Sequence, residues 1–404
     1  MVQRETEKLF GVILDIGVAM IQSGADTHSV EVSLYCLCRS YGFIRNDIWV
    51  VPSNIQGTVT APDGAVITQI RHVRDAGIDF YKLERLNALS RRACVELPDS
   101  VTLHSALTEA NSVGEEHSAR RFLAAALAAA GFGVFFHCNP ADALVAVLVS
   151  AVIVLMSERL RQRENNPLIL NFLISAAAEA IILLCTKLGI GHHSDYITVG
   201  VIMLLISALG TTNGVRDLVH LDTLSGLVNI SSSLTGAIGI ALGTALPLLL
   251  TQVNSGIDPS PLNPSLVLQL IGCTVGCTGF ALWLHVRREY ILFCALGAPL
   301  TWISYILLSD HLGLFPSVLL SAAVCGLYAQ ILARIHNCPA TVFQTISVFP
   351  LIPGSALYYM MYGAVIGDMS LAIDRGLTLL LICFGIVLGF MVVEACISFS
   401  PTRK

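Results

Sequence analysis

In this 404-residue chain, Glu179 lies in the middle of the apolar stretch 171–185, NFLISAAAEAIILLC. Of all the residues, it is the one for which a purely structural role is hardest to assign. An ionised side chain at the centre of a bilayer costs at least about 2.5 kcal/mol on insertion scales, so ionisable residues within spans usually mark ion or substrate pathways. We predict that Glu179 is a proton-coupling or substrate-sensing group. An interhelical hydrogen bond is the structural alternative.

A second chemical feature is the apolar segment 197–215, which small and hydroxyl-bearing residues interrupt before it could cross a bilayer. Helix breaks inside hydrocarbon free backbone amides and carbonyls, and transporters use such groups to hold substrates near the midplane. A second break is predicted at Pro353 and Gly354, where a structural kink is the alternative. Together the breaks give the predicted substrate-binding residues Ser207, Gly210, Thr211, Thr212, Asn213, Pro353, Gly354 and Ser355.

The two breaks occupy equivalent positions of an internal repeat. The pair Leu205-Ile206 recurs 146 residues later as Leu351-Ile352, and GIALG at 239–243 recurs at the same offset as GIVLG at 385–389. Two matches at one offset indicate a duplicated unit. The glycines of both GIxLG motifs predict close helix packing rather than binding.

Charged residues also lie where the broken segments approach the membrane surface. Four of them are predicted to act in gating or at the inner face: Arg216, Asp217, Asp222 and Asp368. Arg216 could instead simply anchor the inner interface. Asp142 and Glu394 lie nearer the ends of apolar segments, and structural roles explain both at least as well.

The composition separates a soluble region from a membrane region. The chain is 54% hydrophobic and 13% charged, whereas an ordinary soluble domain is about 25% charged. Residues 1–118 hold 25 of the 51 charged side chains, which predicts a soluble head before a membrane body. A net charge of −5 without a basic patch argues against nucleic acid as a partner. Twelve scattered cysteines without metal-ligand spacing predict neither a metal site nor a cofactor.

The head, 1–117, is predicted to be a small α+β domain that ends in a linker at 98–116. Apolar residues at helical spacing predict three helices, and turn residues separate three strand candidates. The expected helices are 5–22, 28–41 and 80–95, and the expected strands are 47–51, 55–61 and 65–73.

Polar groups near the start of the second helix have two interpretations. Asp26 or Thr27 is expected to cap that helix. A hydrolase site could also be assembled from Ser23, His28 and Glu31, although no nucleophile elbow surrounds the serine. Helix capping and salt links are the preferred interpretation.

The membrane body is predicted over 118–252 and 264–400. Its apolar segments are 119–137, 140–157, 168–188, 197–215, 224–250, 264–286, 290–308, 314–333, 340–366 and 376–398. If the head lies inside the cell, eleven Arg and Lys residues flank the inner ends of these segments and only Lys187 and Arg375 flank the outer ends. This bias predicts a cell-membrane protein whose N-terminal domain and C-terminus are cytoplasmic.

An odd number of spans in each repeat has a geometric consequence. After five crossings the chain is on the opposite side of the membrane, so the second copy enters upside down. The predicted fold is therefore a mainly α membrane protein of about ten transmembrane helices in two inverted five-helix repeats, preceded by the α+β head. Alternating access exploits this architecture.

Four spaced motifs resemble the threonine/serine exporter family. Residues 23–31, SGADTHSVE, resemble its SGAET-x-x-VE segment, and 87–92 match its NALSRR segment. The central stretch 200–227 and the stretch 339–368, which contains PLIPGSALYYMMYGAVIGD, resemble its two membrane segments. The chain departs from the family at Asp26, where a glutamate is expected, and at Ser207-Ala208, where Pro-Gly is frequent.

The resemblance implies a bacterial secondary exporter that is driven by the proton gradient and is not an enzyme. We expect proton-coupled efflux of small hydrophilic metabolites, first of all threonine and serine, across the lipid bilayer. One alternative is export of dicarboxylates, because a split pair of relatives is linked to succinate. The other is a membrane-anchored hydrolase with the head as catalyst. The sequence leaves open the exact substrate, the coupling ion, the role of the head and whether the chain forms a homo-oligomer.

Overall fold

The computed structural model describes residues 2–74, 77–112, 118–164, 166–206, 208–219, 221–251 and 265–398. The chain divides into two compact units. The N-terminal unit comprises residues 1–116 together with 284–287, and the helical unit comprises 117–283 and 288–404.

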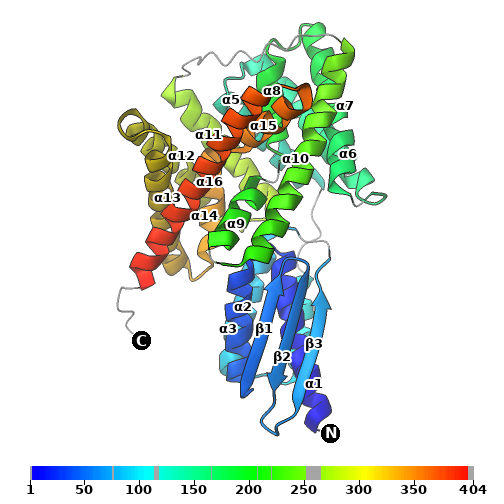
Figure 1. Ribbon diagram of the computed structural model, residues 1–404, viewed down its shortest axis with the longest axis vertical. Helices are drawn as coiled ribbons and strands as arrows, with labels where there is room; N and C mark the ends of the chain where they lie inside the picture. The colour runs from blue at the N-terminus through cyan, green and yellow to red at the C-terminus, as the bar shows by residue number, and fades with distance from the viewer. Residues whose placement is uncertain are drawn as a thin grey trace. The chain divides into compact units, whose positions relative to one another are not determined.

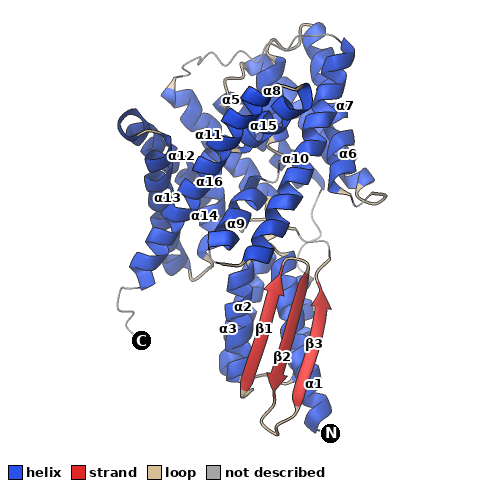
Figure 2. Ribbon diagram, in the orientation of Figure 1, coloured by secondary structure: helices blue, strands red, loops and turns tan. Residues whose placement is uncertain are grey.

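The N-terminal unit is built from helices and one antiparallel sheet of order β1-β2-β3, whose strands are the arrows in Figure 2. The register places Trp49 opposite Gln56 and Gln56 opposite Ile70. These three side chains are exposed, whereas Val50 and Ile55, their neighbours along the strands, are buried. The sheet therefore covers a core on one face, as the alternation of side chains along a strand requires. The elements of this unit are α1 (Val2–Gln22), α2 (Thr27–Ser40), β1 (Arg45–Val51), β2 (Asn54–Thr60), β3 (Val66–His72), α3 (Phe80–Glu96) and α4 (Ser100–Asn111).

Helix capping near α2 is as expected. Asp26 is the N-cap residue, and its Oδ1 accepts a hydrogen bond of 2.9 Å from the Ser29 amide. The apolar residues at helical spacing that predict the first helix are Leu9, Ile13, Ile16 and Met20; the last three are fully buried in α1 and Leu9 is half-buried.

The prediction of a linker over 98–116 is wrong for residues 100–111, which form α4. Asp99 caps this helix by accepting a hydrogen bond from the Thr102 amide. Leu103 and Leu107 are buried four residues apart. Because α4 buries only about one large side chain per turn, its helical period is weak in the sequence.

The helical unit consists of thirteen helical elements in the described residues, and Figure 1 labels most of them. They are α5 (Ser118–Phe135), α6 (Pro140–Leu160), α7 (Pro167–Lys187), α8 (Ser194–Ile202), α9 (Ala208–Val219), α10 (Thr223–Thr251), α11 (Leu266–Trp283), α12 (Arg288–Leu312), α13 (Leu314–His336), α14 (Ala340–Ser347), the short 3-10 helix η1 (Phe349–Leu351), α15 (Gly354–Ile366) and α16 (Met369–Ser398).

Nine helical segments among the described residues are long and apolar enough to cross a membrane. They are α5, α6, α7, α10, α11, α12, α13, the stretch Phe349–Ile366 and α16. The chain is thus a multi-pass membrane protein. The predicted fourth segment, 197–215, is divided between α8 and α9, each of which is shorter than a full span.

The two halves of the helical unit have the same order of elements. α14, α15 and α16 each begin 146 residues after α8, α9 and α10. Contacts repeat in the same way, because α7 packs against α10 as α13 packs against α16, and α10 contacts α15 as α16 contacts α9. The first helices of the two halves, α5 and α11, pack against each other.

Glycines allow these helix pairs to approach closely. A Cβ atom on Gly239 would clash with the backbone of Leu168 in α7, and one on Gly389 would clash with the Leu319 carbonyl in α13. The packing role predicted for the two GIxLG motifs is therefore confirmed at these glycines.

Candidate functional site

Both predicted helix breaks are present in the helical unit. α8 ends at Ile202 and α9 begins at Ala208, with residues 203–206 in irregular conformation between them. The second break separates α14 from α15 and contains η1. A proline, Pro353, precedes the first residue of α15.

Local turns satisfy backbone groups at both breaks. The Leu205 amide donates to the Ile202 carbonyl at 2.8 Å, and the Ile352 amide donates to the Phe349 carbonyl at 3.1 Å. Ser207, the first predicted binding residue, lies outside the described residues.

A cavity with a volume of about 20 Å³ lies where α7, α8, α10 and α15 meet. A polar cavity needs roughly 10–15 Å³ to hold one water molecule, so this one is too small for a metabolite. One half of each broken helix, α8 and α15, contributes to its wall. The lining residues are Glu179, Asp195, Thr198, Leu248, Tyr358, Tyr359 and Tyr362.

Glu179 lines this cavity from α7 and is only 2% exposed. Its Oε2 accepts a hydrogen bond of 2.8 Å from Thr198 Oγ1 in α8. Within the described part of the chain its other oxygen, Oε1, has no hydrogen bond. One face of the carboxyl group is therefore held by a broken helix while the other is available to a proton or a ligand.

Asp195 is a second carboxylate in the cavity wall. It lies three residues before Thr198, on the same face of α8. Its Oδ1 lies 3.5 Å from Ser194 Oγ, a long contact for two oxygens. Among the described lining residues there is no Arg, Lys or His, so no positively charged side chain on this wall offsets the two carboxylates.

Three tyrosines of α15 also line the cavity. The Tyr358 hydroxyl donates a hydrogen bond of 3.3 Å to Thr244 Oγ1 in α10. The Tyr358 ring centroid lies 5.2 Å from that of Tyr359 and 5.7 Å from that of Tyr362. The Arg375 guanidinium from α16 lies 5.9 Å from the centroid of the Tyr359 ring. This contact shows that the tyrosine wall already attracts one cation.

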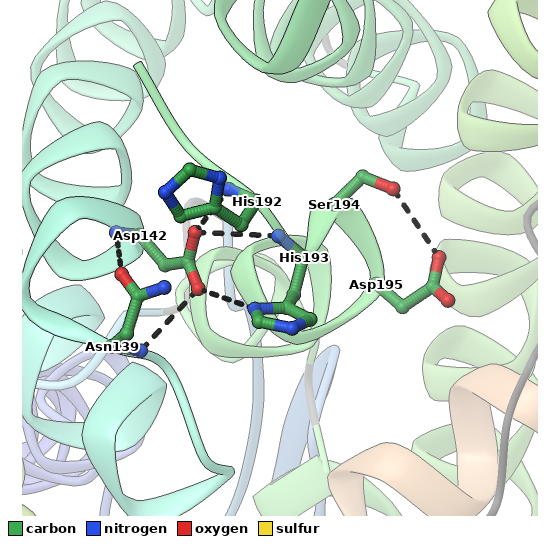
Figure 3. A network of polar contacts seen from close by, with 6 residues as sticks. All are labelled: Asn139, Asp142, His192, His193, Ser194 and Asp195. Atoms are coloured by element: carbon green, nitrogen blue, oxygen red, sulfur yellow. Dashed lines mark hydrogen bonds and ion pairs between the residues drawn. The ribbon is translucent and has the colours of Figure 1, made fainter. Parts of the chain in front are cut away.

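A buried carboxylate fixes the start of α8, as Figure 3 shows. Asp142, in the first turn of α6, is fully buried. Its Oδ1 accepts hydrogen bonds from the amides of His192 at 2.7 Å and His193 at 3.3 Å, and its Oδ2 lies 3.0 Å from His193 Nδ1. The Asn139 amide donates to the same carboxylate. Because His193 directly precedes α8, Asp142 holds the helix that carries Asp195 and Thr198.

Apart from Ser207, which is not described, the residues predicted at the breaks do not line this cavity. Thr211 and Thr212 are buried in α9, and Thr211 Oγ1 has no hydrogen bond among the described residues. Asn213 is exposed and Gly210 is half-buried. Pro353 and Gly354 are buried at the start of α15, and Ser355 is half-buried. Of the predicted site residues that the structure describes, Glu179 alone lies in the cavity wall, and the binding roles at the breaks remain predictions.

The charged residues predicted to act in gating lie apart from the cavity wall. Arg216 Nη2 in α9 lies 3.3 Å from Glu394 Oε1 in α16. Asp217, 7% exposed, accepts a hydrogen bond of 2.8 Å from Asn229 Nδ2 in α10. These contacts tie the end of the first broken helix to its neighbours.

The two remaining predicted gating residues stand directly before long helices. Asp222 precedes α10, and Asp368 precedes α16, where its Oδ1 accepts from the Leu371 amide. They occupy equivalent positions of the two halves, 146 residues apart.

Sequence reasoning did not single out Asp195 or Tyr362. Asp195 precedes the apolar part of its segment, so its position in the sequence indicates a charge at the surface. Helical spacing could have found both residues. Asp195 is three residues before Thr198, and Tyr362 is four residues after Tyr358, so each pair lies on one face of a helix.

The N-terminal unit has its own cleft, of about 540 Å³, lined by parts of α1, β3 and α4. Ser23, His28 and Glu31 do not line it. Ser23 Oγ donates to the Ala19 carbonyl, and Glu31 Oε1 accepts from the Val50 amide at 3.0 Å. Two members of the hypothetical hydrolase site are thus bonded to backbone groups. Among the described residues no group of three or more His, Cys, Asp or Glu could hold a metal ion.

Comparisons with known proteins agree with the motifs. The model of the family described as "Putative threonine/serine exporter" matches residues 11–251, and a second, "Threonine/Serine exporter, ThrE", matches residues 269–396. A curated relative, "Probable threonine/serine exporter" of Mycobacterium tuberculosis (strain ATCC 25618 / H37Rv), is 23% identical over 98% of this chain and 78% of its own length. No solved structure matches the chain. With family models covering both halves of the membrane body, the chain belongs to the threonine/serine exporter family.

Proposed function

We propose that this protein is a secondary active transporter that exports threonine and serine from the cytoplasm in exchange for protons. The observation that carries the proposal is the cavity at Glu179. There a buried carboxyl group on a membrane-spanning helix faces polar groups from one half of each broken helix. Intramembrane carboxyl groups in such positions serve as proton relays in transporters.

The arrangement of the halves supports inverted repeats. In Figure 1, α8 and α15 lie toward the top of the helical unit, and α9 and α14 lie below them. The first half of one broken helix therefore lies at the same end as the second half of the other. Broken helices that run in opposite directions suit alternating access, in which one repeat rocks against the other around a central site.

The size of the cavity supports a closed arrangement of the site. A space of about 20 Å³ cannot hold threonine, so α8 and α15 must separate for the substrate to enter. The segments beside these helices, turns at 203–206 and the short 3-10 helix with its flanking residues at 348–353, supply backbone that can absorb such a movement. Arg216 and Asp217 are then gating groups at the cytoplasmic end, and Asp222 and Asp368 act at the starts of α10 and α16.

Glu179 supplies the coupling step in this scheme. Moving an ionised carboxylate through a closed, water-free state costs at least about 2.5 kcal/mol, whereas a protonated carboxyl group avoids that cost. Glu179 takes up a proton from outside, and releases it inside when the next substrate binds. The N-terminal unit and the C-terminus are cytoplasmic in this topology.

Efflux of preloaded radiolabelled threonine, serine and succinate from cells that carry the protein tests the proposal. We expect efflux of threonine and serine that a protonophore abolishes. Efflux of succinate alone would replace the amino acid substrates by dicarboxylates. Efflux of threonine that ignores the protonophore would remove proton coupling.

The variant Glu179→Gln tests the coupling residue. We expect it to lose transport against a gradient and the response of transport to pH. A matched control is Glu158→Gln in α6, because Glu158 pairs with Arg121 at 3.2 Å and does not line the cavity. A Glu179→Gln protein that still drives uphill efflux with an unchanged pH response would contradict the role of Glu179.

A further inference from the structure

The cavity wall has a charge pattern that suits a cation. It carries two carboxylates, Glu179 and Asp195, and no Arg, Lys or His among its described lining residues. Two carboxylates that face one small space repel each other unless a proton or a cation neutralises them. Each has one hydrogen-bond donor among the described residues, Thr198 for Glu179 and Ser194 for Asp195.

The aromatic wall adds to this preference. Tyr358, Tyr359 and Tyr362 line the same cavity, and the face of a tyrosine ring attracts ammonium and guanidinium groups within about 6 Å. Arg375 already makes such a contact with Tyr359, at 5.9 Å, but it does not line the cavity. A carboxylate in this space would therefore meet two like charges and no cationic side chain of the wall.

We propose that this cavity binds the primary ammonium group of the substrate, with Asp195 and Glu179 as its ion-pair partners and the α15 tyrosines as its aromatic wall. The inference rests on the proposed function and deepens it, because it states which part of the substrate is recognised. Small molecules with an ammonium group and no carboxylate, such as amino alcohols, are then ligands. Carboxylates without an ammonium group, including dicarboxylates, are not.

The same geometry gives a physical basis for exchange. The ammonium group and the proton compete for Glu179, so one leaves as the other binds. The charged and titratable groups around this step are Asp195 on α8, His193 directly before α8, which interacts electrostatically with Asp195, Tyr358, Tyr359 and Tyr362 on α15, and Arg375 on α16. Binding of the ammonium ligand is accordingly expected to weaken as the pH falls and Glu179 becomes protonated.

Ligand binding to the purified full-length chain in detergent tests the inference without requiring transport. The probes are L-threonine, L-threoninol, 3-hydroxybutyrate and succinate, and the readout is the rise in melting temperature with ligand concentration. We expect L-threonine and L-threoninol to stabilise the protein and the two carboxylates to have no effect at the same concentrations.

Variants locate the binding group. Asp195→Asn should weaken L-threoninol binding by about tenfold or more, since it removes a charge-assisted hydrogen bond. Asp195→Glu should restore part of the affinity. Asp310→Asn is the matched control, because Asp310 in α12 is exposed and lies outside the cavity wall.

Several results would overturn the inference. They are binding of 3-hydroxybutyrate or succinate without binding of L-threoninol, no binding of any of the four probes, or a well-folded Asp195→Asn protein with unchanged affinity. The comparison of probes uses the unmodified protein, so it remains decisive even if the variant fails to fold. Failure of efflux with intact L-threoninol binding would count against the proposed function and not against this site.

Discussion

Thr198 Oγ1 donates a hydrogen bond of 2.8 Å to Glu179 Oε2, and both side chains are buried. The bond joins α7, a membrane-spanning helix, to α8, one half of a broken helix. In the proposed cycle α8 moves when the cavity opens, so a change in the protonation of Glu179 would act directly on a moving element. This is the contact through which protonation and conformation are coupled in the proposed cycle.

Thr198→Val is expected to uncouple these two events. Valine has nearly the shape of threonine but cannot donate, so a buried carboxyl oxygen loses its partner at a cost of about 1–3 kcal/mol. We expect a lower melting temperature together with slower proton-dependent efflux. Thr198→Ser keeps the donor and serves as the control. Equal efflux and stability in the valine variant and the unmodified protein would show that the bond has no role.

Much of this architecture could be predicted from the sequence, for identifiable reasons. Glu179 is conspicuous because a charge inside an apolar stretch is rare. The repeat can be recognised because Leu205-Ile206 and Leu351-Ile352 match at an offset of 146 residues. Both signals depend only on residue type and spacing along the chain.

The cavity itself could not be predicted in the same way. Its wall joins Glu179 to Thr198, 19 residues away, and to tyrosines in the other half of the helical unit. Such neighbours are decided by how the helices pack, for which Asp195, at the edge of an apolar segment, gives no signal. Residues at a helix break are conspicuous in a sequence, yet the cavity is lined by residues inside the helices α7, α8, α10 and α15.

Asp142→Asn tests whether the anchor of α8 positions the site. The amide keeps an oxygen acceptor but removes the charge that receives bonds from three backbone amides, those of Asn139, His192 and His193, and from the His193 ring. We expect a loss of about 2 kcal/mol of stability, with a lower affinity for L-threonine because Asp195 and Thr198 are displaced. His193→Ala removes only the ring contact and should have a smaller effect on both measurements. A variant that lost stability but bound L-threonine normally would confine Asp142 to a structural role.

The Arg216–Glu394 pair is expected to affect transport more than stability. Its side chains are 20% and 32% exposed, and partly exposed ion pairs contribute only about 0.2–1 kcal/mol. We expect Arg216→Glu or Glu394→Arg alone to change the melting temperature little but to alter the rate of efflux, because like charges then face each other between α9 and α16. The double exchange should recover much of the rate. If both single variants transport at the normal rate, the pair is not part of a gate.

The N-terminal unit gives a prediction about pH. Asp79 caps α3 through the Lys82 amide, and its Oδ2 lies 3.0 Å from His285 Nδ1 within the same unit. Burial by itself raises the pKa of Asp79, but the hydrogen bonds from His285 and Lys82 outweigh it, so the pKa lies below its usual value. A depressed folded-state pKa stabilises the unit above the unfolded-state pKa, and that stabilisation disappears as the pH falls through the folded-state value.

Asp79→Asn isolates this effect, since asparagine caps a helix about as well as aspartate and removes only the charge. We expect faster hydrogen exchange at the first amides of α3 in the variant at neutral pH. The difference from the unmodified protein should shrink as the pH falls toward the folded-state pKa of Asp79. Asp79→Ala, which also removes the cap, should cost about 1 kcal/mol more at every pH. A difference between Asp79→Asn and the unmodified protein that did not change with pH would mean that the charge of Asp79 does not stabilise the start of α3.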